Sequence, residues 1–188
     1  MFTLKLVFYT IVVLAILSSA VSAQAKERQA WILIDTKSST LIVISADNHE
    51  ILRFHNIAIG SGGVAEQHLR GDETTPLGIF HVAWINSHSR FETFFGLDYP
   101  TPSLAVHAYI TGAITSAEFD AIIDAAHRHN IPPQNTPLGG QLGIHGLGSG
   151  NLLVAQSVDW TDGCVAVTNR EIRLLAHWVH IGTKIIIR

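Results

Sequence analysis

The N-terminal part of the chain alternates short apolar runs with polar turns. After residue 30, β-branched and aromatic side chains gather in runs at 31–35, 41–45 and 51–59, which the segments TKSST and ADNH separate. Runs of this length between turn-forming residues are typical of antiparallel strands. A further strand follows the turn-rich segment RGDETTPLG, in which Pro76 marks the entry. The pattern predicts a β-meander.

Helical spacing is found in two later segments. In TSAEFDAIIDAAHRHN the apolar side chains fall on one face, and Thr115 and Glu118 form a capping-box pattern. In TNREIRLLAHWVH the same pattern is formed by Thr168 and Glu171. Strand signals thin out over residues 86–140 and return in QLGIHG and the final GTKIIIR. These features predict a mainly β domain with two helices and one long irregular insertion.

The first residues have the pattern of an export signal. One lysine, Lys5, precedes an apolar run at 6–17, and small residues end at Ala23. We interpret residues 1–23 as a signal peptide, which leaves a single domain at 24–188 in the periplasm or cell envelope. The alternative is a retained membrane anchor, although the run is shorter than the roughly 20 residues of a bilayer span. No stable membrane insertion is expected after cleavage.

Charge and histidine spacing exclude two classes of site. The net charge of −3 provides no basic surface for nucleic acid. The chain has 11 histidines, but none forms a ligand set with zinc-site spacing, so we expect no metal and no cofactor. His127 and His129 point to different sides of their helix. A zinc peptidase remains a weak alternative.

Cys164 is the only cysteine, which is unusual for an exported protein because such proteins pair their thiols in disulfides. Taken alone, a single cysteine is most often a small buried apolar residue. A nucleophilic thiol needs a nearby base or a positive potential. His145 at a strand end and the helix that starts near Thr168 could supply them. Gly163 allows close approach, and the Gly163 and Cys164 amides are candidate oxyanion donors.

The segments GIHG and TDGCVAVTN together resemble the catalytic signature of the L,D-transpeptidase (YkuD-type) family. That signature is a histidine followed, after a gap, by Ser or Thr, a variable residue, glycine and cysteine. The upstream segments GSGG and RGDETTPLGIF occur in the family's usual order, so the resemblance covers essentially the whole mature chain. It implies a β-sandwich of mixed sheets, with residues 86–140 as a lid over the active-site cleft.

The resemblance also implies roles for single residues. Cys164 would be the nucleophile and His145 the general base, oriented by the backbone carbonyl of Gly146. The implied reaction is acyl transfer on peptidoglycan stem peptides: a thioester forms, terminal D-alanine leaves, and an amine takes the acyl group. Tyr99 and Thr161 are candidate substrate contacts.

Two residues depart from the family pattern. Asp162 stands where a histidine is frequent, and Ala166 where an arginine or asparagine is frequent. We interpret Asp162 as a turn former whose carboxylate faces away from the thiol, and also as a candidate substrate contact. The segments DWTDGCVAVTN and LDYP resemble a YafK-like branch that includes murein hydrolases cutting the link between lipoprotein and peptidoglycan.

Alternative functions therefore stay open at this point. The acyl group could pass to an amine or to water. Transfer to water would make the protein a murein carboxypeptidase, or an amidase that releases a lipoprotein from peptidoglycan. An envelope lipoprotein is therefore a candidate partner. An alternative from another class is a non-catalytic peptidoglycan-binding module.

Overall fold

The structure, a computed structural model, describes residues 30–155 and 157–188. The predicted signal peptide, residues 1–23, lies outside the described residues. The strands are β1 (Trp31–Asp35), β2 (Thr40–Ile44), β3 (Glu50–His55), β4 (Val64–Ala65), β5 (Thr75–Pro76), β6 (Gly78–Ser89), β7 (Glu92–Leu97), β8 (Gly143–His145), β9 (Val165–Ala166) and β10 (Lys184–Ile187). The helices are α2 (Pro102–Ile110), α3 (Ser116–His127), α4 (Leu152–Ala155) and α5 (Asn169–Leu175). In this part of the chain, no helix is long and apolar enough to cross a bilayer.

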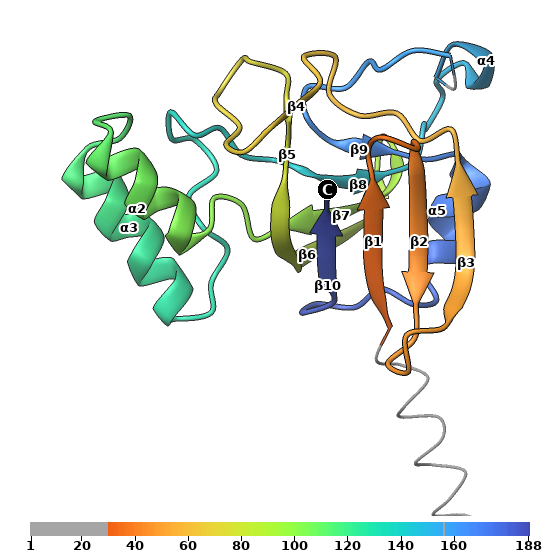
Figure 1. Ribbon diagram of the computed structural model, residues 1–188, viewed down its shortest axis with the longest axis horizontal. Helices are drawn as coiled ribbons and strands as arrows, with labels where there is room; N and C mark the ends of the chain where they lie inside the picture. Colours follow the sequence, from red (N-terminus) through yellow and green to blue (C-terminus); the bar gives the residue numbers. More distant parts are fainter. Residues whose placement is uncertain (1–29, 156) are drawn as a thin grey trace, which may run out of the picture.

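Eight strands form one mixed sheet in the order β3-β2-β1-β10-β6-β7-β8-β9. The β1–β10 and β8–β9 pairs are parallel, and the other pairs are antiparallel. The long strand β6 belongs to both halves of the sheet, and shifts of its register with β7 mark irregularities at which a strand bends. Figure 1 shows β1, β2, β3 and β10 upright, with β7, β8 and β9 running across behind them. The prediction of a mainly β, mixed-sheet fold is confirmed.

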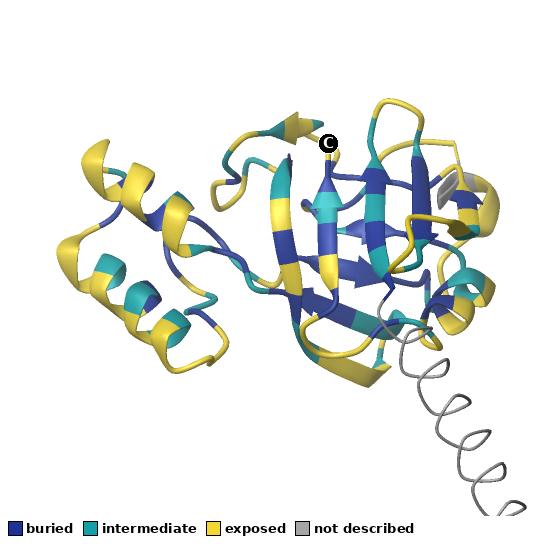
Figure 2. Cartoon of the chain, turned by 60° about the horizontal axis from the view of Figure 1, so that its bottom comes forward, coloured by how far each residue is buried: buried dark blue, intermediate teal, exposed yellow. Residues whose placement is uncertain are grey.

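The core lies between the two halves of this sheet. In β1 the buried and half-buried positions alternate, and Ile32 and Ile34 are directed into the core. From the other side, Ile172 and Leu175 of α5 are fully buried against it. Figure 2 shows the buried residues concentrated along the central strands. The amphipathic pattern of the second predicted helix is therefore what fixes α5 on the sheet.

Residues 86–140 are more regular than the sequence pattern predicts. Strand β6 continues to Ser89, and β7 pairs back along it. The proline-rich part forms α2, because Pro102 is its first residue and Thr101 caps its N-terminus. Proline at the first position of a helix does not break it, so interpreting this stretch as irregular was wrong.

Helix α3 confirms the first predicted helix. It begins after Thr115, and both hydrogen bonds of the capping box with Glu118 are present. Helices α2 and α3 pack against each other and stand at one end of the molecule, away from the upright strands (Figure 1). Together with the one-turn α4, α2 adds to the two helices expected from the sequence.

Candidate active site

Parallel pairing of β8 with β9 brings His145 and Cys164 together. His145 is the last residue of β8 and lies opposite Ala166 of β9, while Cys164 directly precedes β9. Both side chains line one cavity of about 450 Å³. The β6–β7 hairpin and the segment before β8 form its other walls. The structure therefore joins two sequence motifs that are separated in the chain.

The imidazole of His145 is fixed on several sides. Its Nδ1 donates a hydrogen bond to the Gly146 carbonyl oxygen at 2.6 Å. The ring stacks on Phe91 with a centroid distance of 4.4 Å and on Phe94 at 6.0 Å, and Trp160 lies edge-on at 5.9 Å. The side chain is buried, with 2% exposure. Because Nδ1 is the donor, the lone pair of the neutral ring is on Nε2.

The environment of His145 favours its neutral form. Burial lowers the pKa of the imidazole, and the positive charge of Arg90 lowers it further, while the hydrogen bond to Gly146 acts in the opposite direction. The net shift is below the ordinary histidine value. His145 is therefore unprotonated, and able to accept a proton, at neutral pH.

The thiol of Cys164 is also held neutral. It is half-buried and donates to the carbonyl oxygen of Gln141 at 3.4 Å. Burial raises the pKa of Cys164 to about 12; a backbone hydrogen bond from Gly143 lowers it, and the charge of Asp162 raises it. The assistance expected from His145 and from the helix start stays a prediction. A proton must leave the thiol during attack.

Helix α5 does not begin directly at the thiol. Strand β9 separates Cys164 from its N-terminus. The Thr168 hydroxyl accepts the Glu171 amide, and the Glu171 carboxylate accepts the Thr168 amide. The capping box thus satisfies the Thr168 and Glu171 amides at the start of the helix.

Thr161 shapes the turn that carries the nucleophile. Its hydroxyl donates to the Cys164 carbonyl oxygen at 2.6 Å and accepts the Gly163 amide at 3.2 Å. With 3% exposure and both bonds internal, this side chain does not reach a substrate, so that predicted role was wrong.

Gly163 has φ of +118°, and a Cβ there would lie 2.6 Å from the Thr74 carbonyl oxygen. Only glycine fits this position.

The two oxyanion candidates differ in their hydrogen bonds. The Gly163 amide is engaged by Thr161 and would have to release it to stabilise an oxyanion. Within the described chain, the Cys164 amide has no backbone or side-chain acceptor. The oxyanion role stays a prediction, for which Cys164 now offers the available donor.

Tyr99 lies outside the cavity. Its ring is fully buried and its hydroxyl donates to the His68 carbonyl oxygen at 2.5 Å, while burial raises the pKa of the phenol. It has no surface with which to contact a substrate, so the predicted contact was wrong.

Asp162, by contrast, is exposed and lines the cavity. Its charge acts on the Cys164 thiol, which corrects the expectation that it faces away.

Several residues at this site were not found from the sequence. Phe91 and Arg90 reach it from the β6–β7 hairpin, and no motif or spacing links them to His145. Asn169 accepts the Leu147 and Gly148 amides at 2.7 and 2.9 Å, and so holds the loop after His145. Its place directly after a helix cap was the one available signal.

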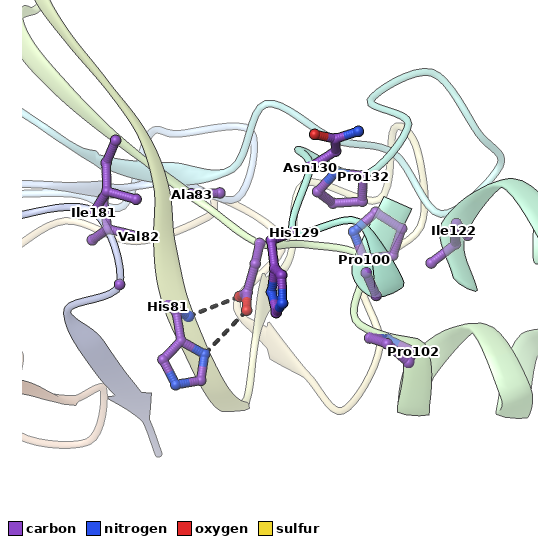
Figure 3. A pocket seen from close by; sticks show the side chains of 13 residues that line it. His81, Val82, Ala83, Pro100, Pro102, Ile122, His129, Asn130, Pro132 and Ile181 are labelled. Carbon is purple, nitrogen blue, oxygen red and sulfur yellow. Dashed lines mark hydrogen bonds and ion pairs between the residues drawn. The ribbon is translucent and has the colours of Figure 1, made fainter. Parts of the chain in front are cut away.

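A second cavity, of about 320 Å³, lies between β6 and the end of α3. At its rim the His81 backbone amide and Nδ1 both bond to the Asp98 carboxylate, at 2.8 and 3.1 Å (Figure 3). Pro100 and Pro132 form part of its apolar wall. Neither Cys164 nor His145 lines it. Helices α2 and α3 of residues 86–140 thus face this second cavity, while the hairpin and Gly140 line the first, so the predicted lid stays a prediction.

No group of three or more His, Cys, Asp or Glu side chains within residues 30–155 and 157–188 could hold a metal ion. The reactive groups that the structure does bring together are a neutral thiol and a neutral imidazole. Their chemistry is that of a nucleophile with a general base.

Comparison with known proteins places this geometry in a family. The model of the L,D-transpeptidase catalytic domain matches residues 29–187. Among solved structures, the helical cell shape determining protein Pgp2 from Campylobacter jejuni aligns with a TM-score of 0.55 and 18% identity, over 85% of this chain and 47% of that one. Bd1075 from Bdellovibrio bacteriovorus aligns with a TM-score of 0.52 and 20% identity, over 85% and 48%. No curated protein matches.

At these identities the solved structures show a shared fold, and the chain spans about half of their length. The family match itself includes both halves of the candidate site, the strand that ends at His145 and the turn at Cys164. The chain belongs to the L,D-transpeptidase catalytic domain family.

Proposed function

We propose that this protein is a cysteine acyltransferase that acts on peptidoglycan stem peptides through a thioester on Cys164. The observation that carries the proposal is the shared cavity of Cys164 and His145, in which Nδ1 of the imidazole is tied to the Gly146 carbonyl. This arrangement leaves Nε2 as the only ring nitrogen that can accept the thiol proton.

The proposed reaction has two halves. The Sγ–H proton passes to Nε2 of His145 as Sγ attacks the donor carbonyl, because a thiol with a raised pKa is not ionised beforehand. The oxyanion accepts a hydrogen bond from the Cys164 amide. The carbon–nitrogen bond to terminal D-alanine then breaks, and the departing amine takes the proton from the imidazole. In the second half an amine attacks the thioester, which regenerates the thiol and forms the new amide.

Hydrolysis through the same thioester is the second candidate. Ala166 is buried among apolar side chains, beside Ala58 and Leu147, so it offers no polar contact to an incoming amine. A site with fewer contacts to the acceptor is expected to select less strongly against water. The products would be a shortened peptide, or a lipoprotein released from peptidoglycan, as the resemblance to the YafK-like branch suggests.

The experiment is a product analysis with disaccharide tetrapeptides. We expect released D-alanine, together with a cross-linked dimer if an amine acts as acceptor or a shortened peptide if water does, identified by mass spectrometry. Activity should persist with a chelator and disappear in Cys164→Ala. Activity in Cys164→Ala, or loss with the chelator alone, would contradict the proposal and favour a metal-dependent enzyme. Binding to peptidoglycan without any turnover would favour the non-catalytic module.

We also propose that the protein is exported. The support is the charged, apolar and small-residue order of residues 1–23. The mature protein from a cell-envelope fraction should begin after Ala23, which N-terminal sequencing would measure. An N-terminus at Met1 would indicate a retained anchor instead.

A further inference from the structure

Three segments of the sequence meet at the buried side of the nucleophile turn. GSGG begins at Gly60, TTPLG contains Thr75, and the turn itself carries Gly163 and Cys164. Gly60 forms an isolated bridge with Thr161, and the Thr75 hydroxyl hydrogen-bonds to both Gly60 and Gly163. Thr75 therefore joins the two upstream segments to the turn.

The directions of the hydrogen bonds at the Thr75 hydroxyl are fixed. The hydroxyl oxygen accepts the Gly60 amide at 2.8 Å, because an amide N–H can only donate. The single hydroxyl proton is then donated to the Gly163 carbonyl oxygen at 2.9 Å. The side chain is fully buried, so water does not compete for either bond. The Gly163 carbonyl is therefore held toward the protein interior.

The Gly163 carbonyl and the Cys164 amide belong to one peptide unit. This unit is trans, so its C=O and N–H bonds point in opposite directions and fixing one also fixes the other. Thr75 does not line the catalytic cavity, whereas Cys164 does. Within the described chain, no backbone or side-chain acceptor engages the Cys164 amide. The amide thus points away from Thr75 and is available to a ligand.

The two neighbouring peptide units are held by a different residue. The Thr161 hydroxyl accepts the Gly163 amide and donates to the Cys164 carbonyl oxygen. Those bonds belong to the units before and after the one that Thr75 holds. Since Gly163 has no side chain, local sterics restrict the rotation of the middle unit only weakly. Thr75 supplies the missing restraint through the carbonyl.

We propose that Thr75 is a positioning residue for the oxyanion donor: its hydrogen bond to the Gly163 carbonyl directs the Cys164 amide into the cavity. The proposal rests on the proposed function and names the side chain that supports the oxyanion in that reaction. When Sγ attacks the donor carbonyl, the carbonyl oxygen gains negative charge and accepts a hydrogen bond from this amide. A donor that already has the right direction needs no reorganisation at that moment. Thr75 therefore acts on the transition state without touching the substrate.

Thr75→Val tests this role, because valine keeps the shape of the side chain and removes the hydroxyl. The kcat for D-alanine release from a disaccharide tetrapeptide should fall by about 10- to 100-fold, since outright removal of an oxyanion donor costs about 100-fold or more. KM should change by less than about twofold, because the bond to the oxyanion exists only in the transition state. Thr75→Ser keeps the hydroxyl donor and should retain kcat within about threefold. An unchanged kcat in Thr75→Val would overturn the proposal.

Alkylation of Cys164 separates this role from a general disturbance of the turn. Iodoacetamide reacts at a saturated carbon and forms no oxyanion. With p-nitrophenyl acetate, by contrast, the thiol takes the acetyl group through an oxyanion and p-nitrophenolate leaves. In Thr75→Val the acetylation rate should fall by about 10- to 100-fold, while the alkylation rate, followed by intact mass, should change by less than about twofold. Equal losses in the two reactions would show that the thiol itself has moved, and would overturn the proposal.

The matched control is Thr183→Val. Thr183 is also a buried threonine, and its hydroxyl accepts the His180 amide. It does not line the catalytic cavity. This variant should lose stability in denaturant unfolding without a loss of kcat or of the acetylation rate. A comparable fall of kcat in Thr183→Val would attribute the effect of Thr75→Val to lower stability, and so count against the positioning role.

If Thr75→Val does not fold, the wild-type protein still provides a test. Acetaldehyde adds to the thiol as a hemithioacetal, whose oxygen takes the place of the oxyanion. The Cys164 amide proton should then move downfield in the NMR spectrum, and no movement would overturn the proposal.

The outcomes also separate this proposal from the proposed function. No release of D-alanine by the wild-type protein would contradict the function alone, because p-nitrophenyl acetate tests the Cys164 amide without a stem peptide. Release of D-alanine with equal kcat in the wild-type protein and Thr75→Val would leave the function standing and remove the role of Thr75.

Discussion

Burial holds the thiol of Cys164 and the imidazole of His145 in their neutral forms. The two pKa values are shifted away from each other, upward for the thiol and downward for the imidazole, so proton transfer between them is unfavourable at rest. A resting thiolate–imidazolium pair would require the opposite shifts. At the scale of single residues, the site is therefore expected to ionise only when a substrate carbonyl is attacked.

This resting state predicts slow alkylation of the thiol. The native protein should react slowly with iodoacetamide at pH 8, and the rate should still increase above pH 9, because the pKa of Cys164 is raised toward about 12. The rate can be followed by intact mass. The same chain unfolded in urea is the control and should show a midpoint near the ordinary cysteine value. A native midpoint below 8.5 would contradict the neutral resting state.

A second prediction concerns the hydroxyl of Thr161. Thr161→Val keeps the shape of the side chain but leaves the Cys164 carbonyl oxygen and the Gly163 amide without their partner. The free energy of unfolding should fall by about 1–3 kcal/mol, the cost of unsatisfied buried groups. Denaturant unfolding measures it. Thr111→Val removes an exposed hydroxyl from a helix end and should lower the free energy of unfolding by less. An equal loss of stability in the two variants would contradict the role given to Thr161.

Among the elements, α5 links the fold to the site. Ile172 and Leu175 fix the helix on the core, and its first residue, Asn169, holds the loop after His145. The helix thus acts on the site through the position of Asn169. The position depends on where the helix begins, which the capping box at Thr168 determines.

The two capping boxes provide a matched pair of tests at this scale. Thr168→Ala and Thr115→Ala should each lower the free energy of unfolding by about 1 kcal/mol. Only Thr168→Ala should also speed amide hydrogen exchange at Leu147 and Gly148, because it loosens the start of α5 and with it Asn169. Equal exchange in both variants would show that the loop is held independently of α5.

For the whole molecule, burial of neutral His145 links stability to pH. The pKa of this histidine is lower in the folded than in the unfolded chain, so the unfolded state binds the proton more readily. The contribution of His145 to stability should therefore be constant above about pH 6.5, the unfolded value, and should be lost as pH falls from there through the lower native pKa.

Denaturant unfolding between pH 7.5 and pH 5 measures this effect. The loss seen in the wild-type protein should be reduced in His145→Gln, which cannot take up the proton, and should persist in His107→Gln, which replaces an exposed histidine. If the free energy of unfolding falls with decreasing pH as steeply in His145→Gln as in the wild-type protein, another group causes the acid sensitivity.

Local pattern was sufficient for much of this fold. Strands β1, β2 and β3 and helices α3 and α5 follow from alternation, helical spacing and caps, which act within a few residues. Helix α2 was missed because its prolines were taken as breaks, although Pro102 begins the helix. The short strand β9 has too few residues for a periodic signal, and its pairing with β8 comes from the rest of the sheet.

The sequence by itself determined the family motif, and within it the candidate nucleophile Cys164 and base His145, because these depend on residue type and order. Only the tertiary structure decided which side chains face the cavity: it buried Tyr99 and Thr161 and brought Arg90 in from a distant hairpin. It also decided the ionisation of the reactive pair. Burial and electrostatic potential are sums over the whole packed chain, and no short stretch of sequence contains them.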